Sequence, residues 1–214
     1  MFDLIMFDLD GTLTDPEEGI TKSVQYALEA YGIQENDRNK LRRFIGPPLV
    51  DGFMNFYGMT REDALKSVDK YRERFSVVGL YENRLFDGTA EMLKTLKNNN
   101  KVLALATSKP HIFASKILEH FDIAKYFDIV VGAELDGTRN EKKEVIKEVL
   151  KRADNCKYPV MIGDRKHDCI GALENGIPCI GVSFGFAEEG ELEENGAFVI
   201  ADDFDDLINI LLKK

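Results

Sequence analysis

The 214-residue sequence has fewer basic than acidic residues, few cysteines and no long apolar run. Its 28 Lys and Arg stand against 38 Asp and Glu, which gives a formal net charge of −10. Because contacts to many phosphates need clustered Lys and Arg, this balance argues against nucleic acid polymers and anionic membranes as partners. No apolar run approaches the ~20 residues of a membrane span, and the start, MFDLIMFDLDGT, lacks the features of a secretory signal.

Cysteine and proline are both scarce. The 3 cysteines are an odd number without C-x-x-C spacing, so they predict neither a disulfide framework nor a zinc site. The 6 prolines are spread along the chain, and there is no internal repeat or low-complexity tract. We therefore expect a reduced, cytoplasmic enzyme or binding protein, long enough for one core and a smaller appended domain.

The sequence does contain a series of short apolar runs separated by helical patterns. Continuous apolar runs are typical of strands buried on both faces of a parallel sheet. Strands that alternate with helices predict an α/β domain of the doubly wound, Rossmann-like kind. The predicted strands are Leu4–Phe7, 102–106, 129–131, 160–162, Cys179–Val182 and a weaker run at 198–200.

One segment breaks this alternation directly after the first strand. It shows no convincing strand, and its apolar residues fall at helical spacing up to Gly32, a residue typical of helix ends. Thr60 and Asp63 form a capping-box pattern that opens a second helix. The segment therefore predicts an all-helical insert. The insert spans residues 15–84, and the sheet domain comprises residues 1–14 and 85–214.

Polar side chains follow the predicted strands at the point where each strand ends. Parallel strands bring their carboxyl ends to one edge of a sheet, so we expect these side chains to meet there, with the insert over them as a lid. Asp8 and Asp10, two apart in an extended chain, project to the same side. In chain order the groups are Asp8-Leu9-Asp10-Gly11-Thr12, Thr107-Ser108-Lys109, Lys142 at a helix start, and Asp164 and Asp168 within GDRKHD.

Four carboxylates packed together repel one another unless a cation shares their site. Oxygen ligands without His or Cys favour Mg²⁺, which usually completes its shell with waters and a substrate phosphate. A Lys and a Thr hydroxyl beside the ion can hold the remaining phosphate oxygens. An acidic turn after a strand often has no function beyond stabilising the turn. These groups together, each at a strand end, nevertheless predict a phosphate site with Mg²⁺.

These residues resemble the motifs of the haloacid dehalogenase superfamily of Mg²⁺-dependent phosphohydrolases. The insert also lies where one subgroup of that superfamily carries its cap domain. The phrases ATSKP, FIGPPL and LDGTR are similar to those of its phosphoglycolate phosphatase-like and 5′-nucleotidase-like branch. The matches are Asp8-Leu9-Asp10-Gly11-Thr12 to DxDxT, Thr107 to the second motif, Lys142 to the third, and Asp164 and Asp168 to GDxxxD.

The resemblance implies a phosphomonoester hydrolase that forms an aspartyl-phosphate with a small phosphorylated metabolite, either a 5′-nucleotide or a phosphoglycolate-like ester. Asp8 is the implied nucleophile, and Asp10 the implied acid and base. The implied Mg²⁺ ligands are Asp8, the main-chain carbonyl of Asp10, and Asp164, with Asp168 either a ligand or a residue that orients a metal-bound water. The implied phosphate-binding groups are Thr107, Lys142 and main-chain N–H groups near Leu9, Asp10 and Ser108.

The cap of such an enzyme is expected to choose its substrate. Gly46 and Pro47 suit a rigid loop over the active site, because proline fixes φ and glycine permits close approach. Arg42 and Arg43, just before that loop, could reach the leaving group of the substrate. A plain turn between helices and solvated arginines are the alternatives here. The resemblance also implies a monomer or a weak homodimer.

Other functions stay open at this point. A phosphosugar mutase of the β-phosphoglucomutase type shares the Asp pair and the cap, so the core motifs do not exclude it. From a different class, a phosphoacceptor switch or binding protein also combines acidic residues with Thr and Lys at strand ends. The third-motif lysine is a further choice, in which spacing to Val145 and Ile146 favours Lys142 over Lys143.

Overall fold

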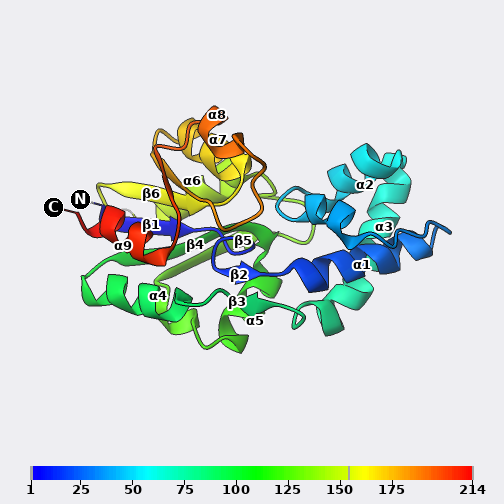
Figure 1. Cartoon of the computed structure of the whole chain (residues 1–214), viewed down its shortest axis with the longest axis horizontal. Coiled ribbons are helices and arrows are strands. Elements are labelled where there is room, and N and C mark those ends of the chain that lie inside the picture. The colour runs from blue at the N-terminus through cyan, green and yellow to red at the C-terminus, as the bar shows by residue number, and fades with distance from the viewer. Residues whose placement is uncertain (1, 154, 214) are drawn as a thin grey trace. The chain divides into compact units, whose positions relative to one another are not determined.

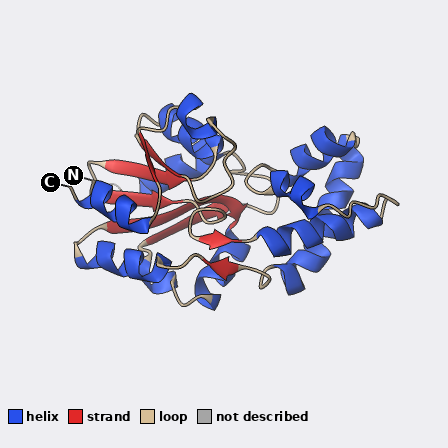
Figure 2. Cartoon of the chain, viewed as in Figure 1, coloured by secondary structure: helices blue, strands red, loops and turns tan. Residues whose placement is uncertain are grey.

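The computed structural model describes residues 2–153 and 155–213 and divides into two compact units. One unit, the sheet unit, comprises Met1–Thr14 and Leu85–Lys214, and the other, the helical unit, comprises Asp15–Arg84 (Figures 1 and 2). Among the described residues, none of the helices has both the length and the apolar character needed to cross a membrane.

The sheet unit contains a parallel sheet of six strands. They are β1 (Leu4–Phe7), β4 (Val102–Pro110), β5 (Ile129–Ala133), β6 (Pro159–Gly163), β7 (Cys179–Val182) and β8 (Val199–Ala201). Their order is β5-β4-β1-β6-β7-β8, so the chain moves outward from the central β1 in both directions. That order is the doubly wound arrangement, and the predicted α/β fold class is confirmed together with all six predicted strands.

Helices cover both faces of this sheet, as Figure 2 shows. In the view of Figure 1, α6, α7 and α8 lie above the sheet and α4 and α5 below it, and α9 packs beside α4. Their bounds are α4 (Thr89–Asn98), α5 (His111–His120), α6 (Lys142–Arg152), α7 (Lys166–Glu174), α8 (Glu191–Glu194) and α9 (Phe204–Leu212), with a short 3₁₀ turn at Ala124–Tyr126.

The central strand β1 is buried on both faces because all four of its side chains are apolar. Leu4 and Met6 belong to the core that α6 and α7 cover, and burying one such side chain contributes about 1.5–3 kcal/mol relative to leaving it exposed. In the sheet register, Phe7 is aligned with Leu105 of β4 and with Ile162 of β6. The segments that follow these three residues therefore leave the sheet side by side at its carboxyl edge.

The helical unit starts and ends at two-residue strands, β2 (Thr14–Asp15) and β3 (Arg84–Leu85), which pair with each other. The sequence predicts no strand at these positions, because a two-residue ladder carries no apolar run to mark it. Between the two strands lie α1 (Glu17–Glu29), a 3₁₀ helix at Arg38–Phe44, α2 (Leu49–Tyr57), α3 (Arg61–Arg74) and one π-helical turn at Phe75–Gly79.

Both helix-end patterns read from the sequence mark helix ends in the structure. Thr60 is confirmed as the N-cap of α3, because its Oγ1 accepts the Asp63 N–H at 3.1 Å, and the Asp63 carboxylate accepts from the Thr60 hydroxyl at 2.7 Å. The glycine expected at a helix end is also confirmed: Gly32, at a left-handed φ of 71°, lies in the turn that closes α1, and its N–H donates to the Glu29 carbonyl at 2.9 Å. The Ile33 N–H there donates to the carbonyl of Leu28, so the turn satisfies a carbonyl of the last helical turn.

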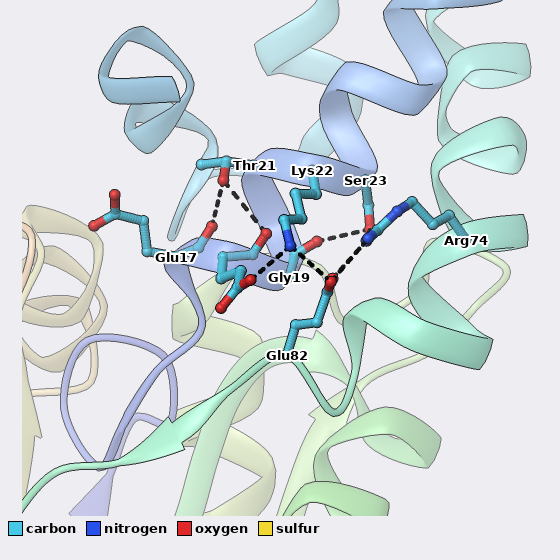
Figure 3. Close-up of polar contacts among 8 residues, drawn as sticks. Glu17, Gly19, Thr21, Lys22, Ser23, Arg74 and Glu82 are labelled. Atoms are coloured by element: carbon cyan, nitrogen blue, oxygen red, sulfur yellow. Dashed lines mark hydrogen bonds and ion pairs between the residues drawn. The ribbon is translucent and has the colours of Figure 1, made fainter. Parts of the chain in front are cut away.

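An ion-pair network joins α1 to the end of α3 and to the loop before β3 (Figure 3). Glu82 accepts from Nη1 and Nη2 of Arg74 at 2.7 and 3.0 Å and from Lys22 Nζ at 3.0 Å. Lys22 also donates to Glu18 at 2.6 Å, and Arg74 donates to Ser23 Oγ at 3.2 Å. Glu82 is thus the shared acceptor that connects these three segments.

Candidate active site

The loop after β1 holds two carboxylates at the carboxyl edge of the sheet. The Asp8 N–H donates to the Ile162 carbonyl at 2.9 Å, which extends the pairing with β6 by one residue. The Leu9 carbonyl then accepts the N–H groups of residues 12–14 and closes a compact turn. Asp8 and Asp10 are therefore fixed by backbone hydrogen bonds on either side of Leu9.

Three carboxylates and one ammonium meet at this edge. Oxygens of Asp8, Asp164 and Asp168 lie within 4.8 Å of one another, and all three residues are buried. Lys142, at the first turn of α6, places Nζ 2.8 Å from Asp8 Oδ1 and 2.8 Å from Asp168 Oδ1. The same Nζ donates to the carbonyl of Ala106 in β4 at 3.0 Å. The structure thus brings together motif residues that are up to 160 positions apart, from Asp8 to Asp168.

Burial and mutual repulsion raise the pKa values of these acids. Loss of solvent raises the pKa of Asp164 well above its usual value, and the neighbouring Asp168 and Asp8 charges add to the shift. Burial also raises the pKa of Asp168 to about 6, although Lys142 opposes that shift. For Lys142 itself burial favours a lower pKa, but the Asp168 and Asp8 carboxylates outweigh burial and raise it. The Lys142 ammonium alone does not balance the charges of the three buried acids, so a further cation would stabilise the site.

The surroundings of Asp164 keep its carboxylate in this cluster. Thr12 Oγ1 donates to Asp164 Oδ1 at 3.3 Å, and the Phe186 N–H donates to Oδ2 at 2.8 Å. A Cβ at Gly185 would lie only 2.3 Å from Asp164 Cβ, so the chain after β7 approaches closely because that residue is glycine. Oriented, buried carboxylates without His or Cys are a donor set that fits a divalent cation such as Mg²⁺.

The two candidate lysines for the third motif have different surroundings. Lys142 is buried between the acids. Lys143 is exposed, with Nζ 2.7 Å from Glu141 and 3.8 Å from Glu174. The geometry places Lys142, and not Lys143, at the acidic cluster.

The remaining expected phosphate-binding groups lie on the same edge. Thr107 is buried at the end of the regular part of β4, and Ser108 beside it is half-buried. Thr107 Oγ1 accepts the Lys109 N–H at 3.2 Å, so the hydroxyl hydrogen is left for another acceptor. Leu9 is completely buried, which leaves its main chain as the part that can contact a ligand.

Lys109 is a site residue that the sequence placed after its strand without predicting a role for it. Its Nζ lies 2.6 Å from Asp10 Oδ2, and the two side chains are only 6% and 12% exposed. Burial raises the pKa of Asp10, and the Lys109 charge opposes that shift. The sequence shows Lys109 among the polar residues after its strand, but nothing in the pattern separates it from a solvated lysine.

Glu191 of α8, which lies outside the predicted motifs, holds the β6–α7 loop that carries Asp164 and Asp168. Arg165 Nε lies 2.9 Å from Glu191 Oε1, and that oxygen also accepts the Lys166 N–H at 2.9 Å. The Arg165 N–H donates to Asp168 Oδ2 at 3.1 Å, which caps the start of α7. No local signal links Glu191 to this loop, because 26 residues separate it from Arg165.

The expected specificity residues all lie in the helical unit. Arg42 Nε pairs with Glu17 Oε2 at 3.2 Å, and the guanidinium carbon of Arg43 lies 4.2 Å from the ring centre of Phe56. Both arginines are exposed. Gly46 has a left-handed φ of 102° and precedes Pro47 in the connection to α2. Each arginine therefore has a contact of its own within the helical unit.

The chain is similar to proteins of known family. Residues 5–182 match the model of the haloacid dehalogenase-like hydrolases. A 5′-nucleotidase of Pseudomonas aeruginosa is 52% identical over 192 residues, which cover 88% of this chain and 86% of that protein. The tyrosine-protein kinase PtkA of Mycobacterium tuberculosis is 34% identical over 198 residues, which cover 92% of this chain and 67% of that protein. A crystal structure of a predicted phosphatase from Clostridium acetobutylicum has a TM-score of 0.96 and 44% identity, with 100% of both chains covered.

Proposed function

The chain belongs to the haloacid dehalogenase-like hydrolases and is a phosphatase of that family, and from this premise we propose that it hydrolyses 5′-nucleotides through an aspartyl-phosphate on Asp8. The observation that carries the proposal is the buried group of Asp8, Asp164 and Asp168 around Lys142. A carboxylate nucleophile beside an ammonium, with a second acid on the same loop, has the parts that stepwise phosphoryl transfer needs.

In the first half of the reaction, a carboxylate oxygen of Asp8 attacks phosphorus and the bond to the ester oxygen breaks. The Asp10 carboxyl gives its proton to that oxygen, so the product leaves as an alcohol. The raised pKa of Asp10, which is caused first by burial, supports this role because a larger fraction of the carboxyl is protonated near neutral pH. The products of this half are the alcohol, the acyl phosphate on Asp8 and the Asp10 carboxylate.

In the second half, water attacks the same phosphorus and the bond to Asp8 breaks. The Asp10 carboxylate takes the proton of the water, which restores the acid for the next cycle. Orthophosphate leaves, and Asp8 is again a carboxylate. One residue therefore serves as acid and then as base, and the net change is hydrolysis of the ester.

The phosphoryl oxygens need positive or donating groups in a protein of net charge −10. Lys142 supplies an ammonium, and Thr107 and the main chain near Leu9 and Ser108 supply O–H and N–H donors. Asp8, Asp164 and the Asp10 carbonyl would hold Mg²⁺, with Asp168 either a ligand or a residue that orients a bound water. When bound, Mg²⁺ offsets the repulsion between carboxylates and phosphate and stabilises charge in the transfer.

We assign the helical unit, residues 15–84, as the cap that selects the substrate. Its specificity residues in this proposal are Arg42, Arg43, Gly46 and Pro47. A 5′-nucleotide is the favoured substrate class because the 52% identical relative is named a 5′-nucleotidase. Phosphoglycolate-like esters are the next class to test.

The test is phosphate release with Mg²⁺ across nucleoside 5′-monophosphates, phosphoglycolate and sugar phosphates. We expect one class to be hydrolysed, and Asp8→Asn and EDTA each to lower release by at least about 10³-fold, since each removes an essential part of the site. The matched control is Asp122→Asn, an exposed carboxylate that leaves the rate unchanged. Full release by Asp8→Asn would contradict the aspartyl-phosphate.

The same assay separates the alternatives. Isomerisation of a sugar phosphate without net phosphate release would identify a mutase. The relative named a tyrosine-protein kinase supports testing transfer to an acceptor other than water. A phospho-Asp8 protein that lasts for minutes without phosphate release would identify a phosphoacceptor switch.

A further inference from the structure

The ion pair between Lys109 and Asp10 has no part in the chemistry described so far. We propose that Lys109 is a positioning residue that holds one oxygen of Asp10 and leaves the other oxygen to exchange protons with the leaving group and with water. This inference rests on the proposed function for its kinetic test. It also predicts a structural change that can be measured without any activity.

The first support is that the two carboxylate oxygens of Asp10 have different surroundings. Oδ2 lies 2.6 Å from Lys109 Nζ. Oδ1 is buried and has no hydrogen-bond partner among the residues the structure describes. An unpartnered buried oxygen is costly unless it serves a ligand. Oδ1 is therefore the atom available for proton transfer, and Lys109 determines where it points.

The second support is the local backbone that brings Lys109 to this place. The register of β4 with β5 shifts between Ala106, aligned with Val131, and Pro110, aligned with Ala133, and irregularities of this kind redirect side chains beside functional sites. A Cβ at Gly132 of β5 would lie 2.6 Å from the Lys109 carbonyl and 2.8 Å from the backbone of His111. Glycine at that position lets this part of β4 approach β5.

The third support is that each lysine of the site serves different acids. Lys142 lies 2.8 Å from oxygens of Asp8 and Asp168, whereas the ion pair of Lys109 is with Asp10. If both lysines only neutralised phosphate, nothing would require them to form ion pairs with different acids. An ion pair between Lys109 and Asp10 can fix the acid without involving the nucleophile.

The kinetic test compares two esters in Lys109→Met, Lys109→Arg and the control Lys116→Met, which changes an exposed lysine of α5. A nucleoside 5′-monophosphate needs its leaving oxygen protonated, whereas the p-nitrophenolate of p-nitrophenyl phosphate leaves as a stable anion. We expect Lys109→Met to lower kcat for the nucleotide about 10²–10³-fold, with KM within about threefold of the wild type. Lys109→Arg recovers much of this loss, and Lys116→Met matches the wild type.

With p-nitrophenyl phosphate, the first half needs no acid but the second half still needs the base. Lys109→Met should therefore release a burst of about one p-nitrophenolate per active site and then accumulate the aspartyl-phosphate. A purely structural role lowers both esters equally and produces no burst. An equal loss of kcat for both esters without a burst would overturn the proposal. A higher KM at unchanged kcat would also overturn it, because Lys109 would then be a phosphate ligand.

The structural test is a crystal structure of Lys109→Met. We expect the Asp10 carboxylate to leave its wild-type rotamer or to occupy several. A carboxylate unchanged in place would overturn the positioning role. If the wild type releases no phosphate from any ester, the proposed function fails, and this structure still decides whether Lys109 orients Asp10.

Discussion

Lys142 and Lys143 are neighbours in the chain with opposite surroundings. One ammonium is buried beside Asp8 and Asp168, and the other is exposed beside Glu141. The first turn of α6 separates them, because successive helical residues point about 100° apart around the axis. This pair offers a direct comparison between a site lysine and a surface lysine of the same type.

We expect Lys142→Met to lower phosphate release by at least about 10²-fold, because it removes the cation that balances the buried carboxylates and donates to phosphate. Lys143→Met should keep the wild-type rate within about twofold, since its pairs are exposed. Steady-state phosphate release under saturating nucleotide measures both. A loss in Lys143→Met equal to that in Lys142→Met would contradict the assignment of the third-motif lysine.

At the scale of elements, Glu82 connects α1, α3 and the loop before β3 within the helical unit (Figure 3). Hydrogen bonds from Arg74 lower the pKa of Glu82; burial opposes them, and Lys22 adds to the lowering. A folded-state pKa below the unfolded one means that the carboxylate stabilises the folded unit. The stabilisation by the Glu82 carboxylate is fully present above pH 4.5, the ordinary pKa of the group. It is lost as the pH falls through the lowered pKa of the folded state.

Glu82→Gln should therefore lower the thermal midpoint at pH 7 by a few degrees, equivalent to about 1 kcal/mol for loss of charged hydrogen bonds. The difference from the wild type should shrink as the pH falls from 5 towards 3. Calorimetric scans across that range measure it. Glu62→Gln is the matched control, because its pair with Lys66 is exposed and its removal changes the midpoint little. A midpoint difference independent of pH would contradict the ionic origin.

At the scale of the whole molecule, acidity concentrates where the proposed substrate must bind. The chain carries a formal charge of −10, and three of its carboxylates are buried within 4.8 Å of one another. Repulsion among them opposes folding unless positive charge is supplied. A ligand that binds the folded state alone raises its stability by mass action.

Mg²⁺ should consequently raise the thermal midpoint of the protein even without substrate. At a concentration one hundred times the dissociation constant, the gain is about 2.7 kcal/mol, or roughly 5–10 °C for a chain of this size. Potassium chloride of equal ionic strength should produce little of this shift. Asp164→Asn should lose the response to Mg²⁺ while its own midpoint without metal stays equal or rises, because one repelling charge is gone. An equal response in this variant would contradict the proposed metal site.

Local pattern along the chain was enough to predict the sheet and the polar positions at its carboxyl edge. Apolar runs identified all six strands of the parallel sheet and hence the doubly wound fold. Polar residues directly after those runs predicted Asp8, Asp10, Thr107 and Asp164 at one edge, because parallel strands place their carboxyl ends there. Lys142 was predicted from its place at a helix start. These inferences need only the order of residues along the chain and the direction of the strands.

Tertiary structure alone decided the contacts that no local pattern records. The pair of Lys109 with Asp10 lies where the register of β4 shifts and where Gly132 permits close approach of the chain. The hydrogen bond from the Phe186 N–H to Asp164 and the contact of Glu191 with Arg165 cross 22 and 26 residues. The physical reason is that such contacts follow from register, bulges and close backbone approach, which are properties of packed strands and not of any one segment.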